Sequence, residues 1–281
     1  MIIVGVDGSR AGLEAAAWAA REAALRKVPL TIGHAISAWV LESSDGGRYA
    51  EVAAWMRQGG RSVLAAAEER AKHERPEVEP DVVLLGGDPR KALIDASRDA
   101  DLLVIGNHGL GKLRGLLVGS VAHGVAGHAG CDVVVVRELP ARPRGEIVAG
   151  VDGSPASARV LAFAFAEAEL RGVSLRVVHA WSWPGLEPTT GGGRERTIMR
   201  EALAGHRERH PGVHVLEEIV QGHPVEVLGE AATGSDLLVI GSRGHGAFAG
   251  MVLGSVSQAL LQHSPVPLAV VRIRAEHHTE G

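Results

Sequence analysis

Residues 101–109 read Asp-Leu-Leu-Val-Ile-Gly-Asn-His-Gly, and residues 236–244 read Asp-Leu-Leu-Val-Ile-Gly-Ser-Arg-Gly. Each stretch is an apolar run of strand length that ends in glycine, and after nine more residues each is followed by Gly-Ser. Glycine lets the backbone adopt positive φ and approach a ligand closely. A helix that begins at the Gly-Ser pair presents unpaired N–H groups that attract an anion. The doubled pattern therefore predicts two phosphate-binding loops, each at the end of a buried strand.

The rest of the chain repeats in step with these loops. The sequence Gly-Val-Asp-Gly-Ser at residues 5–9 returns at residues 150–154, an offset of 145, and Gly87 returns as Gly222, an offset of 135. The second copy has therefore lost ten residues between positions 36 and 86. A repeat of this length is a whole domain rather than a solenoid unit. We expect two similar domains at residues 1–138 and 146–275, a linker at 139–145 and a polar tail at 276–281.

Short apolar runs alternate with helical patterns within each copy. In the first copy the runs predict strands at residues 2–6, 30–34, 78–85, 102–105 and 133–136, and the patterns between them predict helices at 9–27 and 48–74, after Pro89 and after Ser120. In the second copy the fifth strand is expected at 268–273. Strands that are apolar throughout and alternate with helices indicate an α/β fold with a parallel sheet covered on both faces. Segments 40–60 and 183–195, which contain the difference in length, are rich in Gly, Ser and Trp and predict mobile loops.

Composition excludes several classes of function. The net charge is −4, no dense Lys/Arg run occurs, and the aromatic residues are scattered, which disfavours nucleic-acid binding. Cys131 is the single cysteine, so no intramolecular disulfide forms and a reducing compartment fits. The first residues lack the basic region of a signal peptide, and no apolar stretch approaches the roughly 20 residues of a membrane span. We expect a soluble, cytoplasmic protein without membrane partners.

The motifs together resemble those of the universal stress proteins in their tandem two-domain form. The resemblance rests on Val-Asp-Gly-Ser at residues 6–9, Gly-x-Pro at 87–89, the G-x2-G-x9-G-S pattern and His-Ala-Gly-Cys-Asp-Val-Val-Val-Val-Arg at 128–137. It covers almost the whole chain twice. It implies two doubly wound domains, each with a five-stranded parallel sheet in the order 3-2-1-4-5 and ATP in its crevice. It also implies a regulatory role in stress response or dormancy, with a homodimer or an intramolecular pseudo-dimer formed through the fifth strands.

The resemblance further implies which residues contact the nucleotide. In the first copy they are Val6, Asp7, Gly8, Ser9, Ala35, Ile105, Gly106, His108, Gly109, Gly119, Ser120, Val121 and Ala122. In the second copy they are Val151, Asp152, Gly153, Ser154, Ala180, Ile240, Gly241, Arg243, Gly244, Gly254, Ser255, Val256 and Ser257. The alanines meet the adenine edge through their backbone, the isoleucines line the base, and the glycine loops hold ribose and phosphates.

The two aspartates have two possible roles. Asp-Gly-Ser is also turn and helix-cap chemistry, so Asp7 and Asp152 can be purely structural. A carboxylate beside a triphosphate needs a cation or a ribose hydroxyl between them, and Mg²⁺ is usually held by few carboxylates together with substrate phosphates. We therefore expect Asp7 and Asp152 to bind Mg²⁺ carried by ATP.

The two predicted sites differ. Ser257 offers a hydroxyl to the phosphates where the first copy has Ala122. The first copy instead carries Lys112 and Arg114 where the second has Ala247 and Ala249. We expect both sites to bind ATP, with different affinity and a different dependence on salt.

Other nucleotide and enzyme motifs do not fit. The run from Gly106 to Lys112 matches the start of a P-loop, but Leu113 stands where Ser or Thr must hold Mg²⁺. The dinucleotide fingerprint G-x-G-x-x-G is absent after the first strand. His206 and His210 share a helix face, but Arg207 replaces the glutamate of a zinc protease. No nucleophile elbow or water-positioning group emerges, so ATPase activity is at most weak, and the catalytic residues stay unknown. An adenine-nucleotide hydrolase or transferase, or a nucleotide-free scaffold, is the alternative.

Overall fold

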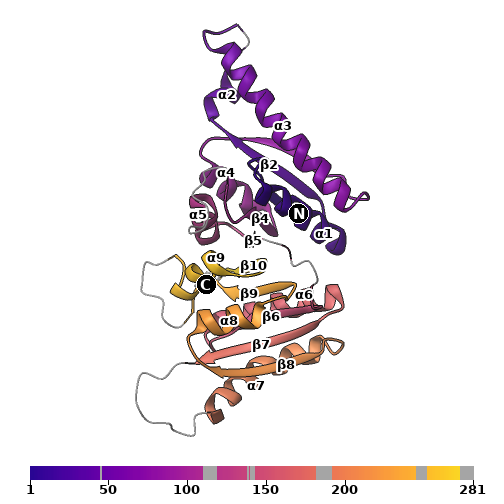
Figure 1. Cartoon of the computed structure of the whole chain (residues 1–281), viewed down its shortest axis with the longest axis vertical. Helices are drawn as coiled ribbons and strands as arrows, with labels where there is room; N and C mark the ends of the chain where they lie inside the picture. Colours follow the sequence, from indigo (N-terminus) through magenta and orange to yellow (C-terminus); the bar gives the residue numbers. More distant parts are fainter. Residues whose placement is uncertain are drawn as a thin grey trace, which may run out of the picture.

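The computed structural model describes residues 1–44, 46–109, 119–137, 139, 143–181, 192–244 and 252–272. The first half of the chain contains β1 (Ile2–Gly5), α1 (Arg10–Arg26), β2 (Leu30–Ile36), α2 (Ala38–Glu42), α3 (Ala50–Glu74), β3 (Asp81–Gly86), α4 (Pro89–Ala96), a 3-10 turn (Ser97–Asp99), β4 (Leu102–Gly106), α5 (Ser120–His128) and β5 (Asp132–Val136). The second half contains β6 (Glu146–Gly150), α6 (Pro155–Arg171), β7 (Ser174–Trp181), α7 (Gly192–Arg209), β8 (Val215–Gln221), α8 (Pro224–Ala232), β9 (Leu237–Gly241), α9 (Ser255–His263) and β10 (Leu268–Val271). Strands and helices alternate in both halves, as the sequence predicts (Figure 1).

The ten strands form one continuous sheet in the order β3-β2-β1-β4-β5-β10-β9-β6-β7-β8. The predicted order 3-2-1-4-5 is confirmed in the first half, and the second half runs through the equivalent order in the opposite direction. Within each half all pairings are parallel. β5 and β10 pair antiparallel, with Val134 opposite Ala269. The fifth strands are therefore interior strands of the sheet, and β3 and β8 are its two edges.

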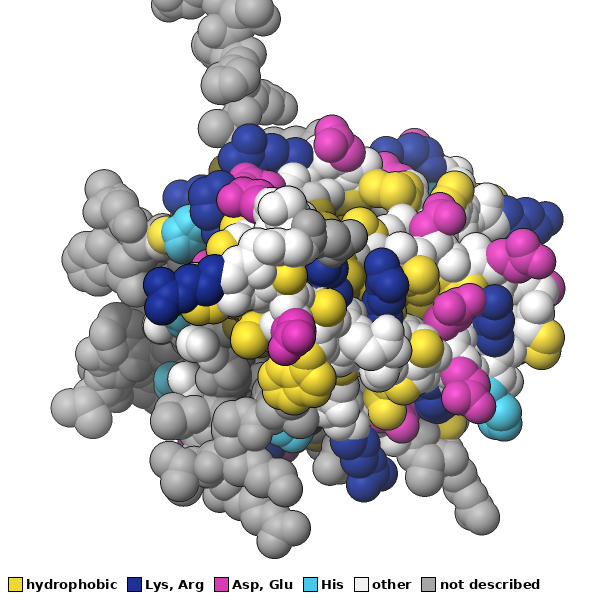
Figure 2. All heavy atoms as spheres, turned by 90° about the horizontal axis from the view of Figure 1, so that it is seen from above, with side chains coloured by type: hydrophobic (Ala, Val, Ile, Leu, Met, Phe, Trp, Pro, Cys, Tyr) yellow, Lys and Arg dark blue, Asp and Glu magenta, His cyan; other side chains and the backbone are white. Residues whose placement is uncertain are grey.

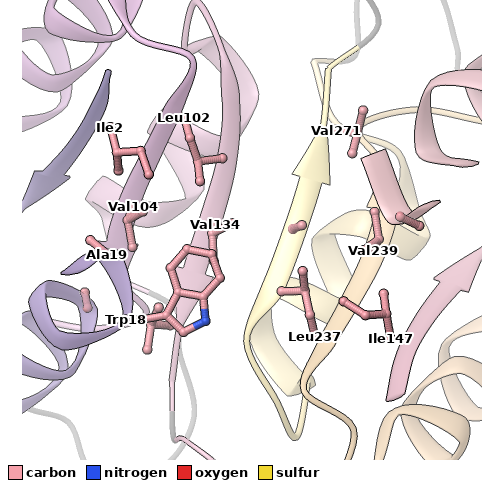
Figure 3. Packing of buried hydrophobic residues seen from close by; sticks show 14 of the residues in the cluster. Ile2, Trp18, Ala19, Leu102, Val104, Val134, Ile147, Leu237, Val239 and Val271 are labelled. Carbon is pink, nitrogen blue, oxygen red and sulfur yellow. The ribbon is translucent and has the colours of Figure 1, made fainter. Parts of the chain in front are cut away.

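Helices cover both faces of this sheet. On one face α1 and α6 pack against the central strands, and their buried side chains form one apolar cluster that continues across the β5–β10 junction. Figure 3 shows Trp18 of α1 beside Val104 and Val134 in this cluster. A second cluster lies on the other face, beneath α4, α5, α8 and α9. Because α1 buries mainly alanines, it lies close to the sheet: a Cβ added to Gly106 would stand 2.8 Å from the backbone of Ala11.

The prediction of a mobile loop at 40–60 is wrong for most of that segment. Residues 38–42 form α2, and α3 begins at Ala50. Ile36, Val40 and Ala53 are buried together in a small apolar cluster, and the Arg57 guanidinium donates to the Val40 carbonyl at 2.8 Å. The turn-forming residues that follow α2, Ser-Ser-Asp-Gly-Gly at 43–47, concealed a short helix that depends on these contacts. Of the loop predicted at 183–195 in the second copy, residues 183–191 lie outside the described residues, and residues 192–195 belong to α7.

A buried cluster of four charged groups joins α1 to α6. Glu22 and Glu167 have side chains only 1% and 2% exposed, and each pairs with both Arg26 and Arg171. Each glutamate and each arginine has its counterpart 145 residues away, so the cluster has the pseudo-twofold symmetry of the repeat. Burial, and then the neighbouring Glu22 carboxylate, raise the pKa of Glu167 to about 7. None of the helices in the described part of the chain is long and apolar enough to cross a bilayer.

Candidate functional site

Each half has a pocket at the carboxyl ends of its two central strands. β1 and β4 are parallel neighbours with Gly5 opposite Ile105, and β6 and β9 are paired in the same way. The chain leaves β1 toward β2 on one side, whereas β4 lies on the other side, so the strand order reverses at this point. Such a reversal opens a crevice in which α/β proteins bind ligands. The described residues enclose about 320 Å³ in the first pocket and about 210 Å³ in the second.

The structure brings most of the predicted site residues together. In the first half the pocket is lined by Val6, Asp7, Ala35, Ile105, Gly106, His108, Gly109, Gly119, Ser120, Val121 and Ala122. In the second half it is lined by Val151, Asp152, Ala180, Ile240, Gly241, Arg243, Gly244, Gly254, Ser255, Val256 and Ser257. Gly8, Ser9, Gly153 and Ser154 do not line the pockets; they form the turns that lead into α1 and α6. The residues at 112, 114, 247 and 249 lie outside the described residues.

The two ends of each glycine pattern meet. The N–H of Gly119 donates to the carbonyl of Asn107 at 2.9 Å, and the N–H of Gly254 donates to Ser242 at the same distance. Gly119 and Gly254 are the N-caps of α5 and α9, so no side chain at the cap covers the first N–H groups of either helix. The loop after the strand and the helix N-terminus thus face the same pocket from two sides, which is the arrangement that favours an anion.

The aspartate of each half closes a turn and also forms a wall of the pocket. Oδ1 of Asp7 accepts from the Ser9 N–H at 3.0 Å, and the intervening Gly8 has a φ of 82°. The other carboxylate oxygen lies against Gly109, where an added Cβ would overlap it. Asp152 lies against Gly244 in the same way. The second glycine of the pattern is therefore required by the carboxylate as well as by any phosphate that the loop binds.

The start of the following helix is built differently in the two halves. Ser9 Oγ accepts from the Gly12 N–H at 3.1 Å and contacts the His108 carbonyl at 3.4 Å, which links α1 to the glycine loop. In the second half Ser157 replaces Gly12, and its hydroxyl donates to Oδ1 of Asp152 at 3.1 Å. Ser157 lines the second pocket and Gly12 the first. The sequence analysis missed this pair because it lies three residues beyond the repeated motif, inside the helix.

The hydroxyl of Ser257 has a different partner from the expected phosphate. Ser257 Oγ donates to the Gly241 carbonyl at 2.7 Å, and the residue is only 4% exposed. A serine has one hydroxyl hydrogen, so in this arrangement none remains for a phosphate oxygen. Ser257 therefore links α9 to the end of β9 at the wall of the pocket.

Apolar residues of α4 and α8 complete each pocket. Pro89 and Leu93 line the first pocket, and Pro224 and Leu228 the second. Leu93 lies so close to β1 that a Cβ on Gly5 would stand 2.8 Å from its Cδ atoms. The sequence analysis named Pro89 as the start of a helix but missed both leucines, although each follows its proline by four residues, one helical turn later. His34 also lines the first pocket, and its Nδ1 donates to the Val6 carbonyl at 2.8 Å.

Few of the described residues that line the pockets are ionisable. The first pocket has Asp7 together with two histidines, and the second has Asp152 and Arg243. Within the described ranges no group of three His, Cys, Asp or Glu side chains is placed to hold a metal ion. One carboxylate per pocket fits a Mg²⁺ ion that takes its remaining ligands from phosphates and water.

Comparisons with known proteins identify relatives that match both halves of the chain. The model of the Universal stress protein family matches residues 1–137 and 144–272. The universal stress protein Rv2623 of Mycobacterium tuberculosis is 37% identical over 287 residues, which cover 96% of each chain. A universal stress protein from Archaeoglobus fulgidus DSM 4304 has a solved structure with a TM-score of 0.72 at 20% identity, covering 96% of this chain and 98% of that one. Another, solved in complex with cAMP, is 31% identical and covers 48% of this chain and 94% of its own, with a TM-score of 0.39.

Proposed function

The chain belongs to the universal stress protein family, and we propose that each of its halves binds one molecule of ATP in the pocket between its glycine loop and its second strand. The two domains are those expected from the repeat, residues 1–138 and 146–275. Nucleotide occupancy makes the protein a regulatory module in stress response or dormancy. We place this role in the cytoplasm, where a thiol such as that of Cys131 stays reduced.

The observation that carries the proposal is that each half forms a pocket with an apolar side and an anion-attracting side. Ala35, Leu93 and Ile105 line the apolar side of the pocket in the first half. Gly109, Gly119 and Ser120 lie at the other side, where the N-terminus of α5 opens. A ligand with a planar apolar base at one end and phosphates at the other matches this polarity. The second half repeats it with Ala180, Leu228 and Gly254.

Mg²⁺ enters this proposal with the nucleotide. Asp7 and Asp152 are the carboxylates that line the pockets, and each presents one oxygen beside its glycine loop. When bound, the ion neutralises the charge between carboxylate and phosphates. Hydrolysis of ATP is at most slow, because the described residues of the two glycine loops include no carboxylate or glutamine that could position a water molecule.

The paired fifth strands support the intramolecular pseudo-dimer. β5 and β10 pair with each other, so neither strand leaves an edge to which another chain could add a strand. The two pockets therefore belong to one continuous sheet, and a single chain presents both.

Two measurements test the proposal. Freshly purified protein is denatured and the released small molecules are identified by mass spectrometry, and ATP binding to the emptied, refolded protein is followed by calorimetry. We expect an adenine nucleotide and two sites per chain. The variants Ala35→Phe and Ala180→Phe fill the base side of one pocket each, so each removes one site and leaves the other. A protein that releases no nucleotide and binds none would refute ATP binding, and rapid turnover lost in Asp7→Ala would instead indicate a hydrolase or transferase.

A further inference from the structure

A third cavity lies where the two halves of the chain meet, on the side of the sheet that α1 and α6 cover (Figure 1). The described residues enclose about 290 Å³ in this junction cavity, which is close to the volume of the first pocket. One face of α1 and Arg75 at the end of α3 line it from the first half, and Arg171 and Asp236 line it from the second. None of its lining residues belongs to either of the other two pockets.

Three side chains bring hydrogen-bond donors to the junction cavity and leave most of them unused: Trp18, Arg21 and Arg75, which we call the donor residues. Nε and Nη2 of Arg21 have no hydrogen-bond partner among the described residues, so no hydrogen bond fixes these two nitrogens. The Arg75 guanidinium makes no hydrogen bond or ion pair within the described ranges. Trp18 is only 6% exposed, and its indole N–H donates to none of the described residues. Figure 3 shows this ring nitrogen turned toward the second half.

The ionisable side chains that line the junction cavity leave one positive charge in excess. Among the described lining residues, Arg21, Arg75 and Arg171 lie with two carboxylates, Glu22 and Asp236. Glu22 and Arg171 pair with each other in the buried cluster, and the Asp236 carboxylate accepts from a backbone N–H of the linker at 3.1 Å. A ligand with a single negative charge would therefore bring the total charge of the lining to zero.

The positive charge of Arg21 is poorly compensated where it lies. Burial lowers the pKa of Arg21, and the neighbouring Arg70 and Arg75 lower it further, against the opposing effect of Glu74. Glu74 lies 3.4 Å from Nε of Arg21 and also pairs with Arg70 at 2.9 Å. At the surface of the first half, charges of opposite sign are interspersed: Figure 2, which looks onto the end of the molecule formed by that half, shows Lys and Arg next to Asp and Glu. An anion in the cavity would stabilise the crowded guanidinium groups.

The second half does not repeat the donor residues. At the corresponding positions, 145 or 135 residues later, it has Phe163, Ala166 and His210. Phenylalanine and alanine side chains offer no hydrogen bond, and Nδ1 of His210 already lies 2.9 Å from a carboxylate oxygen of Glu169. Glu22, in contrast, is repeated as Glu167 in the buried cluster. The fold therefore requires the cluster but not the donor residues.

We propose that the junction cavity binds a small organic carboxylate, with the carboxylate group between Arg21 and Arg75 and the apolar body against Trp18, Leu25 and Leu139. Guanidinium groups bind carboxylates through paired, charge-assisted hydrogen bonds. The single excess charge favours a carboxylate over a doubly charged phosphate. Pockets for small molecules measure roughly 300–1,000 Å³, and this cavity lies at the lower end, so its ligand is compact.

Titration of the full chain with benzoate and with hexanoate tests the proposal. The chain has five tryptophans, and nitrogen-15 labelling of their indoles gives one NMR signal for each. The Trp18 signal is the one that disappears in Trp18→Phe, which introduces the residue of the second half. We expect at least one of the two carboxylates to shift this signal saturably at millimolar concentrations. The shift should persist in excess ATP, because the cavity shares no residue with the other pockets. Benzyl alcohol, which resembles benzoate without its charge, should not produce it.

Substitutions taken from the second half locate the site. Arg21→Ala and Arg75→His should each weaken carboxylate binding by about tenfold to a hundredfold, because each removes charge-assisted hydrogen bonds. The remaining indole signals show whether each variant is folded. Arg61→Ala is the matched control, since Arg61 is exposed and lies fourteen residues before Arg75 on α3, roughly 21 Å along the helix. It should leave the affinity unchanged.

Three results would overturn the proposal. The first is a Trp18 signal that neither carboxylate moves. The second is binding that survives undiminished in folded Arg21→Ala and Arg75→His, or that Arg61→Ala weakens as much as they do. The third is tighter binding of phenyl phosphate than of benzoate, which would make the ligand a phosphate.

Discussion

Replacing Glu167 by glutamine should flatten the dependence of stability on pH. Glu167 is 2% exposed, and burial followed by the Glu22 carboxylate raises its pKa from 4.5 to about 7. A carboxyl group whose pKa is higher in the folded state binds more protons folded than unfolded. Its contribution is therefore fully present below pH 4.5 and is lost as the pH rises through 7.

The size of the effect follows from these two pKa values. Between pH 5.5 and 8.5, a site that titrates near 7 when folded and at 4.5 when unfolded lowers the free energy of unfolding by about 2 kcal/mol. Glu167→Gln resembles the protonated carboxyl group in shape and cannot ionise, so it lacks this loss. The remaining ionisable groups, including His206, whose pKa is lowered by burial, contribute alike to both proteins. The difference between the two profiles of unfolding free energy against pH is therefore the contribution of the Glu167 carboxyl group in its cluster.

Urea denaturation at a series of pH values measures this difference directly. Glu22→Gln serves as the second variant, because it removes the neighbouring negative charge but leaves Glu167, Arg26 and Arg171 in place. We expect the dependence of its stability on pH to lie between those of the unmodified chain and of Glu167→Gln, since the pKa of Glu167 falls when the neighbouring charge is removed. If Glu167→Gln loses stability with rising pH as steeply as the unmodified chain, the buried carboxyl group does not carry the proton and the reasoning fails.

Three further predictions concern the pockets and the helices that begin beside them. Gly109→Ala should displace the Asp7 carboxylate and remove ATP binding from the first site alone, measured as the stoichiometry in calorimetry, and two remaining sites would contradict it. Ser9→Ala should lower the free energy of unfolding by about 1 kcal/mol, because Ser9 caps α1. Ser154→Ala should change the free energy of unfolding little, because that hydroxyl has no partner among the described residues; equal losses in urea denaturation would oppose this assignment. Ser257→Ala should lower the free energy of unfolding by about 1 kcal/mol, because it removes the hydrogen bond to Gly241, and it should leave the affinity for ATP unchanged. Weaker ATP binding at the second site in titrations would show instead that the hydroxyl contacts phosphate.

Periodicity and the repeat predicted the order of elements, because both depend on residues close in sequence. The glycine pattern likewise predicted the meeting of Gly119 with the loop after β4, since a strand end and a helix start fix the path of the chain between them. Contacts between distant side chains were beyond this reasoning. α2 is stabilised by Arg57, which lies on the next helix, and the fused sheet depends on β5 meeting β10. Leu93 and Ser157 were missed for the same reason: helix packing, and not the motif, directs them into the pockets.

The repeat offers an internal comparison that separates demands of the fold from tasks of one half. Glu22 and Arg26 are matched by Glu167 and Arg171, because a pseudo-twofold junction requires each half to supply the same pair. Val82 and Val83 are not matched, and nothing in the packing of β3 forbids glutamate, since β8 carries it on the same frame. A difference that the fold does not impose reflects the surroundings of each edge. β3 has an exposed charge, Asp81, at the position where β8 has Leu216, so each edge carries charged side chains of the kind that oppose pairing with another strand, but at different points along the strand.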